Sequence, residues 1–165
     1  MKQLTFLRHA KSDWTDEVLS DIDRPLNKRG YKDAYDGSAL FLEQDMKPDA
    51  LYVSTATRTI STAMIFARTL MLKSENIHLS PWYYQTTVKA ILSFAQDLPD
   101  NLSHVMFVGH NPVSTDICNA LLKSGSIDDI PTCGLISLHF PNSTWRTLAL
   151  NSGELQYYQF PNITK

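Results

Sequence analysis

The sequence predicts an α/β fold, a three-layer αβα sandwich whose mixed, mainly parallel sheet lies between two layers of helices. Short apolar runs, typical of buried strands, alternate with segments whose apolar residues recur at helical intervals. Two of these runs lead directly into a histidine, in Leu4–Ser12 (LTFLRHAKS) and in His104–Pro112 (HVMFVGHNP). Ligands of open α/β sheets bind just beyond the carboxyl ends of strands, so the same two segments predict a functional crevice.

Length and composition are those of an ordinary globular protein, expected to form one domain over residues 1–165. The chain has 165 residues, of which 43% are hydrophobic and 19% are charged. This is sufficient for a full hydrophobic core. A net charge of −2 argues against nucleic-acid binding, which needs a strong basic surface.

Targeting and membrane segments are not expected. The apolar run Gln3–Leu7 is too short for a signal peptide, and no stretch approaches the roughly 20 apolar residues that span a bilayer. Cys118 and Cys133 do not form a Cys-x-x-Cys pair, which disfavours a disulfide framework or a structural zinc site. We therefore expect a soluble cytoplasmic protein that has no membrane partner.

The strands are expected in five runs of mostly apolar residues: Gln3–Leu7, Ala50–Ser54, Val105–Gly109, Gly134–Phe140 and Leu155–Phe160. The first three alternate with helical segments, which predicts parallel pairing. The last two follow each other with a loop at Pro141–Trp145, which predicts an antiparallel edge of the sheet.

Four helices are predicted between these strands. Lys28–Glu43, Thr57–Leu72 and Thr86–Leu98 have apolar residues at helical spacing, and a fourth helix begins at Pro112 because proline is favoured in the first turn. Asn27 is the expected N-cap of the first helix. On that helix we expect one shared face made of Tyr31, Ala34, Tyr35, Ser38, Ala39 and Leu42.

The ends of three predicted strands carry side chains suited to binding and transferring a phosphoryl group. Arg8 and His9 follow the first strand, and His110 follows Val105–Gly109. Arg58 lies where the second strand passes into a helix, whose first N–H groups and positive dipole end also favour an anion. A neutral imidazole can attack phosphorus, and guanidinium groups suit the phosphoryl oxygens. A catalytic metal is not expected, because two arginines beside a cation would repel it.

Motifs over nearly the whole chain resemble those of the histidine phosphatase, or phosphoglycerate mutase-like, superfamily and in particular its SixA-type phosphohistidine phosphatases. In chain order they are LRHAKSDW at Leu7–Trp14, DRPLNKRG at Asp23–Gly30, STATRTISTA at Ser54–Ala63, VGHNP at Val108–Pro112 and PTCG at Pro131–Gly134. Ala10 stands where the wider superfamily has glycine in its Arg-His-Gly signature.

The resemblance implies a phosphoglycerate mutase-like fold and a set of site residues. His9 is the implied nucleophile, while Arg8, Arg58 and His110 bind the phosphoryl group. Ser12, Asp13 and Arg24 are weaker candidates for binding it. No cofactor is implied. Because the nucleophile must be unprotonated, we expect activity to fall between pH 7 and pH 5.

One departure from the superfamily bears on the substrate. In many members an acidic residue protonates the leaving oxygen. In this chain the corresponding region, Ser80–Gln85, has no carboxylate. An alkoxide needs that proton, whereas the imidazole of phosphohistidine leaves with little help. The sequence therefore favours a phosphohistidine substrate, unless another acid such as Asp13 substitutes.

We expect the substrate to be a protein that carries phosphohistidine, either a phosphotransfer domain of signal transduction or a phosphocarrier of sugar uptake. Two alternatives remain: a phosphomonoesterase acting on a small metabolite, and a module that binds phosphohistidine without turnover. A mutase is disfavoured, because 165 residues leave little room to enclose a bisphosphate. Most of the acidic run Asp13–Asp23 is expected to be a solvated loop, with the alternative that it flanks the pocket and disfavours multiply charged phosphometabolites.

Overall fold

Six strands form one sheet in the computed structural model, which describes residues 1–141 and 144–161. The strands are β1 (Lys2–Arg8), β2 (Ala50–Ser54), β3 (Ile77–Ser80), β4 (His104–Gly109), β5 (Leu135–Phe140) and β6 (Glu154–Gln159). Their order is β3-β2-β4-β1-β5-β6. The first four run parallel to one another, while β5 is antiparallel to both of its neighbours. The predicted mixed, mainly parallel sheet is confirmed.

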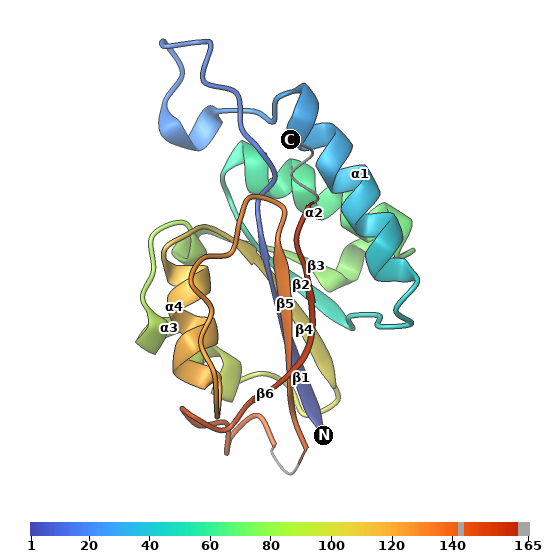
Figure 1. Ribbon diagram of the computed structural model, residues 1–165, viewed down its shortest axis with the longest axis vertical. Coiled ribbons are helices and arrows are strands. Elements are labelled where there is room, and N and C mark those ends of the chain that lie inside the picture. The colour runs from blue at the N-terminus through green and yellow to red at the C-terminus, as the bar shows by residue number, and fades with distance from the viewer. Residues whose placement is uncertain (142–143, 162–165) are drawn as a thin grey trace.

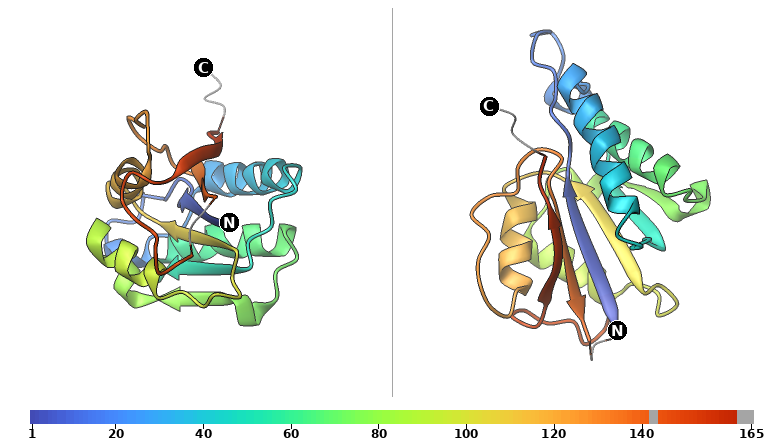
Figure 2. Two further views of the ribbon diagram at one scale, coloured as in Figure 1. Left: turned by 90° about the horizontal axis from the view of Figure 1, so that it is seen from below. Right: turned by 45° about the vertical axis from the view of Figure 1, so that its right-hand side comes forward.

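The helices lie in two layers, one on each face of this sheet (Figures 1 and 2). One layer holds α1 (Lys28–Leu42) and α2 (Thr57–Thr69), which pack together, and the other holds α3 (Val88–Gln96) and α4 (Val113–Leu121). Three short 3-10 turns connect the elements: η1 (Asp21–Asp23), η2 (Ser74–Asn76) and η3 (Pro81–Tyr83). This arrangement is the predicted three-layer sandwich.

The first helix begins as predicted but buries a different face. The Asn27 side chain accepts a hydrogen bond from the Gly30 backbone N–H, which fixes the first turn. The predicted face is only partly buried, because Tyr31 and Tyr35 are exposed. The buried residues of α1 are Gly30, Ala34, Gly37, Ser38 and Phe41. The prediction was right for Ala34 and Ser38 and wrong for the other positions, because it left out the two glycines, at which the helix approaches neighbouring groups closely.

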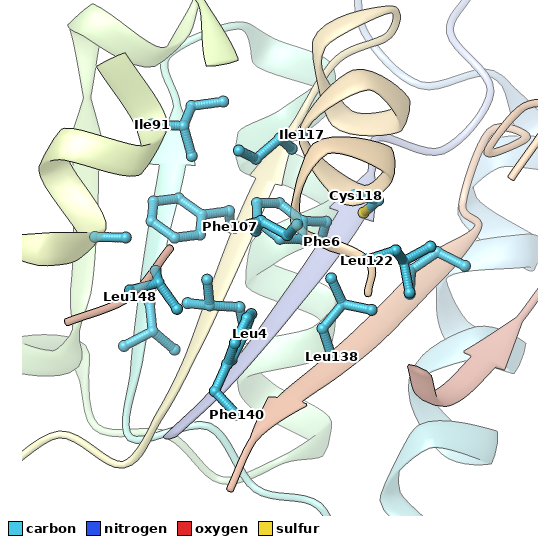
Figure 3. Packing of buried hydrophobic residues seen from close by; sticks show 14 of the residues in the cluster. Leu4, Phe6, Ile91, Phe107, Ile117, Cys118, Leu122, Leu138, Phe140 and Leu148 are labelled. Carbon is cyan, nitrogen blue, oxygen red and sulfur yellow. The ribbon is translucent and has the colours of Figure 1, made fainter. Parts of the chain in front are cut away.

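Each face of the sheet has its own hydrophobic core, because the apolar strands are buried on both sides. On the α3/α4 face, side chains of β1 and β4 such as Leu4, Phe6 and Phe107 lie in one buried cluster with Ile91 and Ile117 (Figure 3). On the other face, Leu7 and Val108 pack with Phe41 of α1 and Phe66 of α2. The two cores hold β1 and β4 rigidly in the centre of the sheet.

Strand β3 was missed by the sequence prediction. Its four residues pair only with β2 at the edge of the sheet, and His78 and Leu79 are exposed. A strand so short and half exposed lacks the apolar run that identifies buried strands. The predicted loop Pro141–Trp145 lies partly outside the described residues, which exclude 142–143. None of the helices in the described ranges is long and apolar enough to cross a bilayer.

Candidate active site

The register of the central strands brings three of their carboxyl ends to one place. Arg8 of β1 lies opposite Gly109 of β4, and Val53 of β2 lies opposite Val108. The residues that follow these pairs therefore lie side by side at the same edge of the sheet. The ring centroids of His9 and His110 are 5.3 Å apart, a spacing at which one tetrahedral anion can contact both imidazoles.

Backbone contacts fix the orientation of the His9 imidazole. The His9 N–H donates to the Gly109 carbonyl, and the next N–H, of Ala10, donates to the Thr62 hydroxyl of α2. The ring Nδ1 lies 2.7 Å from the Ala10 carbonyl oxygen. A carbonyl can only accept, so Nδ1 carries the proton and Nε2 keeps its lone pair. This is the tautomer that a nucleophile acting through Nε2 requires.

Burial and neighbouring cations keep this imidazole neutral. Burial is the main cause that lowers the pKa of His9 to about 3, opposed by its hydrogen bond to the Ala10 carbonyl and reinforced by His110, Arg58 and Arg8. Burial likewise lowers the pKa of His110 to about 4. This pKa places the protonation of free His9 below pH 5, so it does not account for the loss of activity that we expected between pH 7 and pH 5.

Arg58 presents two edges of its guanidinium group to two different neighbours. It lies in the first turn of α2 and is 5% exposed. Its Nε lies 3.4 Å from His9 Nε2, so this edge faces the nucleophilic position. Its Nη1 donates to the Asp21 carbonyl at 2.6 Å, and its Nη2 donates to the Asp21 carboxylate at 2.9 Å.

Asp21 is a site residue that the sequence analysis did not single out. It belongs to the acidic run Asp13–Asp23, most of which was expected to be a solvated loop, with the alternative that the run flanks the pocket. Tyr84 donates its phenolic O–H to the carboxylate at 2.6 Å, and Arg24 Nη2 donates to it at 2.7 Å. The Tyr84 hydrogen bond is the main cause that lowers the pKa of Asp21 to about 2. The carboxylate is therefore ionised at neutral pH. No spacing in the sequence connects Asp21 with Arg58, because the path of the loop alone brings them together.

A serine hydroxyl orients the second histidine. Ser54 Oγ, at the end of β2 and fully buried, lies 2.7 Å from His110 Nε2. When this hydroxyl donates to Nε2, the proton of the neutral ring is on Nδ1, which can then donate to a phosphoryl oxygen. Tyr84 contacts the same imidazole edge-on, with ring centroids 5.5 Å apart. Ser54 was quoted only as part of a motif, and its role was not foreseen.

Arg8 is held by the segment that follows α4. Its Nη1 donates to the Ile130 carbonyl at 2.7 Å and lies 3.5 Å from the Asp129 carboxylate. The buried Nε of Arg8 has no hydrogen-bond partner among residues 1–141 and 144–161. Buried donors are rarely left unpaired, so this N–H is suited to a phosphoryl oxygen.

The three weaker candidates lie in different surroundings. Ser12 is buried and pairs through its backbone with Leu26. Asp13 is half-buried, and its carboxylate accepts hydrogen bonds from the Thr15 N–H and hydroxyl. Arg24 is buried, stacks on Trp14 with 3.3 Å between guanidinium carbon and ring centroid, and binds Asp21. Of the three, Arg24 alone is connected to Arg58, through the Asp21 carboxylate.

The other histidines have structural surroundings. His104 Nε2 lies 2.8 Å from the Thr5 hydroxyl inside the sheet, while His139 pairs with Glu154 and His78 stacks on Tyr52. Over the described part of the chain, no group of three or more His, Cys, Asp or Glu residues is arranged to hold a metal ion.

Comparisons with known proteins find sequence relatives of this chain. A sequence model described as the histidine phosphatase superfamily (branch 1) matches residues 4–79. An uncharacterized chloroplastic protein of Arabidopsis thaliana is 29% identical over 160 residues, covering 92% of this chain and 72% of that protein.

Solved structures show the same fold over almost the whole chain. A structure described as a candidate SixA phosphohistidine phosphatase from Agrobacterium tumefaciens has a TM-score of 0.80 and 26% identity, covering 97% of this chain and 98% of that one. A similarly described structure from Nakamurella multipartitia has a TM-score of 0.84 and 23% identity, covering 98% and 96%. The chain therefore resembles the histidine phosphatase superfamily in sequence over residues 4–79 and shares the fold of these two structures over almost its whole length.

Proposed function

We propose that this protein is a phosphatase of the histidine phosphatase superfamily. It removes phosphoryl groups from phosphohistidine on a protein, through a covalent phosphohistidine intermediate on His9. The observation that carries the proposal is the neutral, oriented imidazole of His9, whose Nε2 faces Arg58 Nε and whose ring lies beside that of His110. The similarity to structures described as SixA phosphohistidine phosphatases supports the same substrate class.

In the first step, the Nε2 lone pair of His9 forms a bond to phosphorus while the P–N bond of the substrate breaks. The electron pair of that bond stays on the leaving imidazole, which departs as a neutral ring when its other nitrogen is protonated. Arg8, Arg58 and His110 donate hydrogen bonds to the equatorial phosphoryl oxygens, which carry about two negative charges. Such preorganised donors stabilise the transition state.

In the second step, a water oxygen attacks the phosphorus of phospho-His9. The P–Nε2 bond breaks, its electron pair returns to Nε2, and the proton of the water is lost to inorganic phosphate or to solvent. The proton stays on Nδ1, which donates a hydrogen bond to the Ala10 carbonyl throughout. His9 thus returns to the tautomer in which it began.

The carboxylates around the site support a phosphohistidine substrate over an ordinary phosphate ester. Asp21 has a pKa of about 2, and hydrogen bonds from Thr15 are the main cause that lowers the pKa of Asp13. Both are ionised at neutral pH, and neither is poised to protonate a leaving oxygen. An imidazole leaving group does not need that acid.

For the partner, we propose a protein carrying the modified histidine on an accessible surface, as in phosphotransfer domains of signal transduction or phosphocarriers of sugar uptake. Such partners are consistent with the cytoplasmic location that we propose for this protein.

The test is hydrolysis of a histidine-phosphorylated phosphotransfer domain by wild type, by His9→Ala and by His78→Ala. His78 is exposed in β3, so it is the matched control for loss of an imidazole. We expect His9→Ala to abolish hydrolysis and His78→Ala to retain it; hydrolysis that persists in His9→Ala would remove the proposed nucleophile.

Two further arms separate the alternatives. Faster turnover of p-nitrophenyl, sugar or nucleotide phosphates than of phosphohistidine would favour a small-molecule phosphomonoesterase. Binding of a phosphohistidine peptide without release of phosphate would favour a recognition module.

A further inference from the structure

The Arg58 guanidinium already binds one anion, which belongs to the protein itself. The Asp21 carboxylate and carbonyl occupy its outer edge, formed by Nη1 and Nη2. The inner edge, which begins at Nε, faces His9 Nε2. An arginine can serve two acceptors in this way because its donors form a rigid planar fork. A phosphoryl group on His9 can therefore use the inner edge while Asp21 keeps the outer one.

Asp21 is fixed in place by more than Arg58. Tyr84 from the η3 side and buried Arg24 from its own loop both donate to the carboxylate. The Asp21 side chain is still 52% exposed, and the segment that carries it projects beyond the sheet at the end where β1 finishes (Figure 1). Asp21 therefore places a negative charge at the entrance to the site.

This placement distinguishes between classes of phosphorylated substrate. Some small metabolites have a second anionic group a few atoms from phosphorus, and binding would bring that group against the Asp21 carboxylate. Arg58 could not neutralise it, because Asp21 already occupies the outer edge of the guanidinium group. Juxtaposed like charges are strongly unfavourable in a partly buried site. A phosphohistidine has an imidazole ring, which carries no negative charge, at the corresponding position, and it is not repelled by Asp21.

We propose that Asp21 is a specificity-determining residue that excludes phosphorylated compounds carrying a second anionic group and thereby favours an isolated phosphoryl group on an imidazole. This inference rests on the proposed function, because it takes Arg58 as a ligand of the phosphoryl group.

The test uses two ligands of nearly equal shape, 3-phosphoglycerate and glycerol 3-phosphate, which differ in a carboxylate against a hydroxymethyl group. Their dissociation constants are measured by titration calorimetry, which does not depend on turnover. In wild type we expect 3-phosphoglycerate to bind more weakly. In Asp21→Asn we expect the ratio of the two constants to fall by about tenfold, as expected when one like-charge contact is removed.

Two control variants test whether the preference depends on the negative charge at position 21 and not on the total charge of the loop. Asp21→Glu keeps the carboxylate and should retain the wild-type preference. Glu17→Gln removes one charge from the same loop, where Glu17 is exposed, and should also retain it. A thermal unfolding midpoint for each variant verifies that the fold is intact.

The proposal is overturned if Asp21→Asn strengthens binding of both ligands equally, which would show that Asp21 obstructs the pocket without distinguishing between them. It is also overturned if both are weakened equally, or if Glu17→Gln changes the ratio as much as Asp21→Asn does. If neither ligand binds to wild type, the anion site itself fails. Failure of the proposed nucleophile is a separate result, since His9→Ala tests it by hydrolysis.

Discussion

Replacing Arg58 by lysine separates the charge of this residue from its two hydrogen-bonding edges. The arginine donates through Nη1 and Nη2 to Asp21 while its Nε faces His9 Nε2 at 3.4 Å. A lysine keeps the positive charge but has one ammonium group, which cannot occupy both positions. Arg58→Lys therefore tests whether geometry, in addition to charge, stabilises the transferring phosphoryl group.

The size of the effect follows from what is lost. In the proposed transition state the inner edge of Arg58 donates to a phosphoryl oxygen, and removing one such preorganised donor typically costs about 3–4 kcal/mol. This corresponds to a loss of about 10²–10³-fold in kcat. Because Arg58 is 5% exposed, water has little access to replace the missing donor.

The assay is steady-state hydrolysis of a histidine-phosphorylated phosphotransfer domain, with Arg29→Lys as the matched control. Arg29 has an exposed side chain that forms an i,i+4 ion pair with Asp33 on α1. Lysine keeps this charge, so Arg29→Lys should leave the rate within about twofold. A loss of less than about fivefold in Arg58→Lys would refute the reasoning, because charge alone would then be sufficient.

Three further predictions concern residues around the site and the fold. Ser54→Ala removes the hydroxyl that orients His110. It should reduce kcat/KM roughly tenfold, because one hydrogen bond contributes about 1.5 kcal/mol. An unchanged kcat/KM would show that Ser54 does not orient His110 for catalysis. Burial lowers the pKa of His104 to about 4, so the unfolded chain binds the proton more readily than the folded protein does. The free energy of unfolding should therefore fall as the pH drops below about 6.5, and this group contributes up to about 1.4 kcal/mol per pH unit. Urea unfolding at pH 7 and pH 5 measures this, and equal or higher stability at pH 5 would be the contrary result. In Gly109→Ala the new Cβ would lie 2.6 Å from the buried Tyr83 ring, and the variant should lose about 1–3 kcal/mol of stability in the same assay; unaltered stability would show that the ring can move.

The sheet, its two helical layers and the meeting of the strand ends could be predicted because the signal is local. Buried strands such as β1 and β4 are apolar runs, and the polar residues that follow them must lie at the carboxyl edge of a parallel sheet. For this reason His9, His110 and Arg58 could be placed near one another from sequence, although their roles remain predictions.

The remaining features depend on contacts that no local pattern encodes. The short edge strand β3 has too few buried residues to be recognised, and the buried face of α1 depends on glycines that carry no hydrophobic signal. Asp21 reaches Arg58 across 37 positions of sequence through the path of an exposed loop. In sequence it is indistinguishable from the solvated acids beside it.

The most direct test of the central claim is to find where the phosphoryl group resides during turnover. Wild-type enzyme is mixed with a histidine-phosphorylated protein, quenched in alkali within milliseconds and analysed by mass spectrometry of its peptides. We predict a transient, acid-labile phosphoryl group on His9 that is absent in His9→Ala. Release of phosphate without any phosphoenzyme, or a phosphoryl group on another residue, would contradict it.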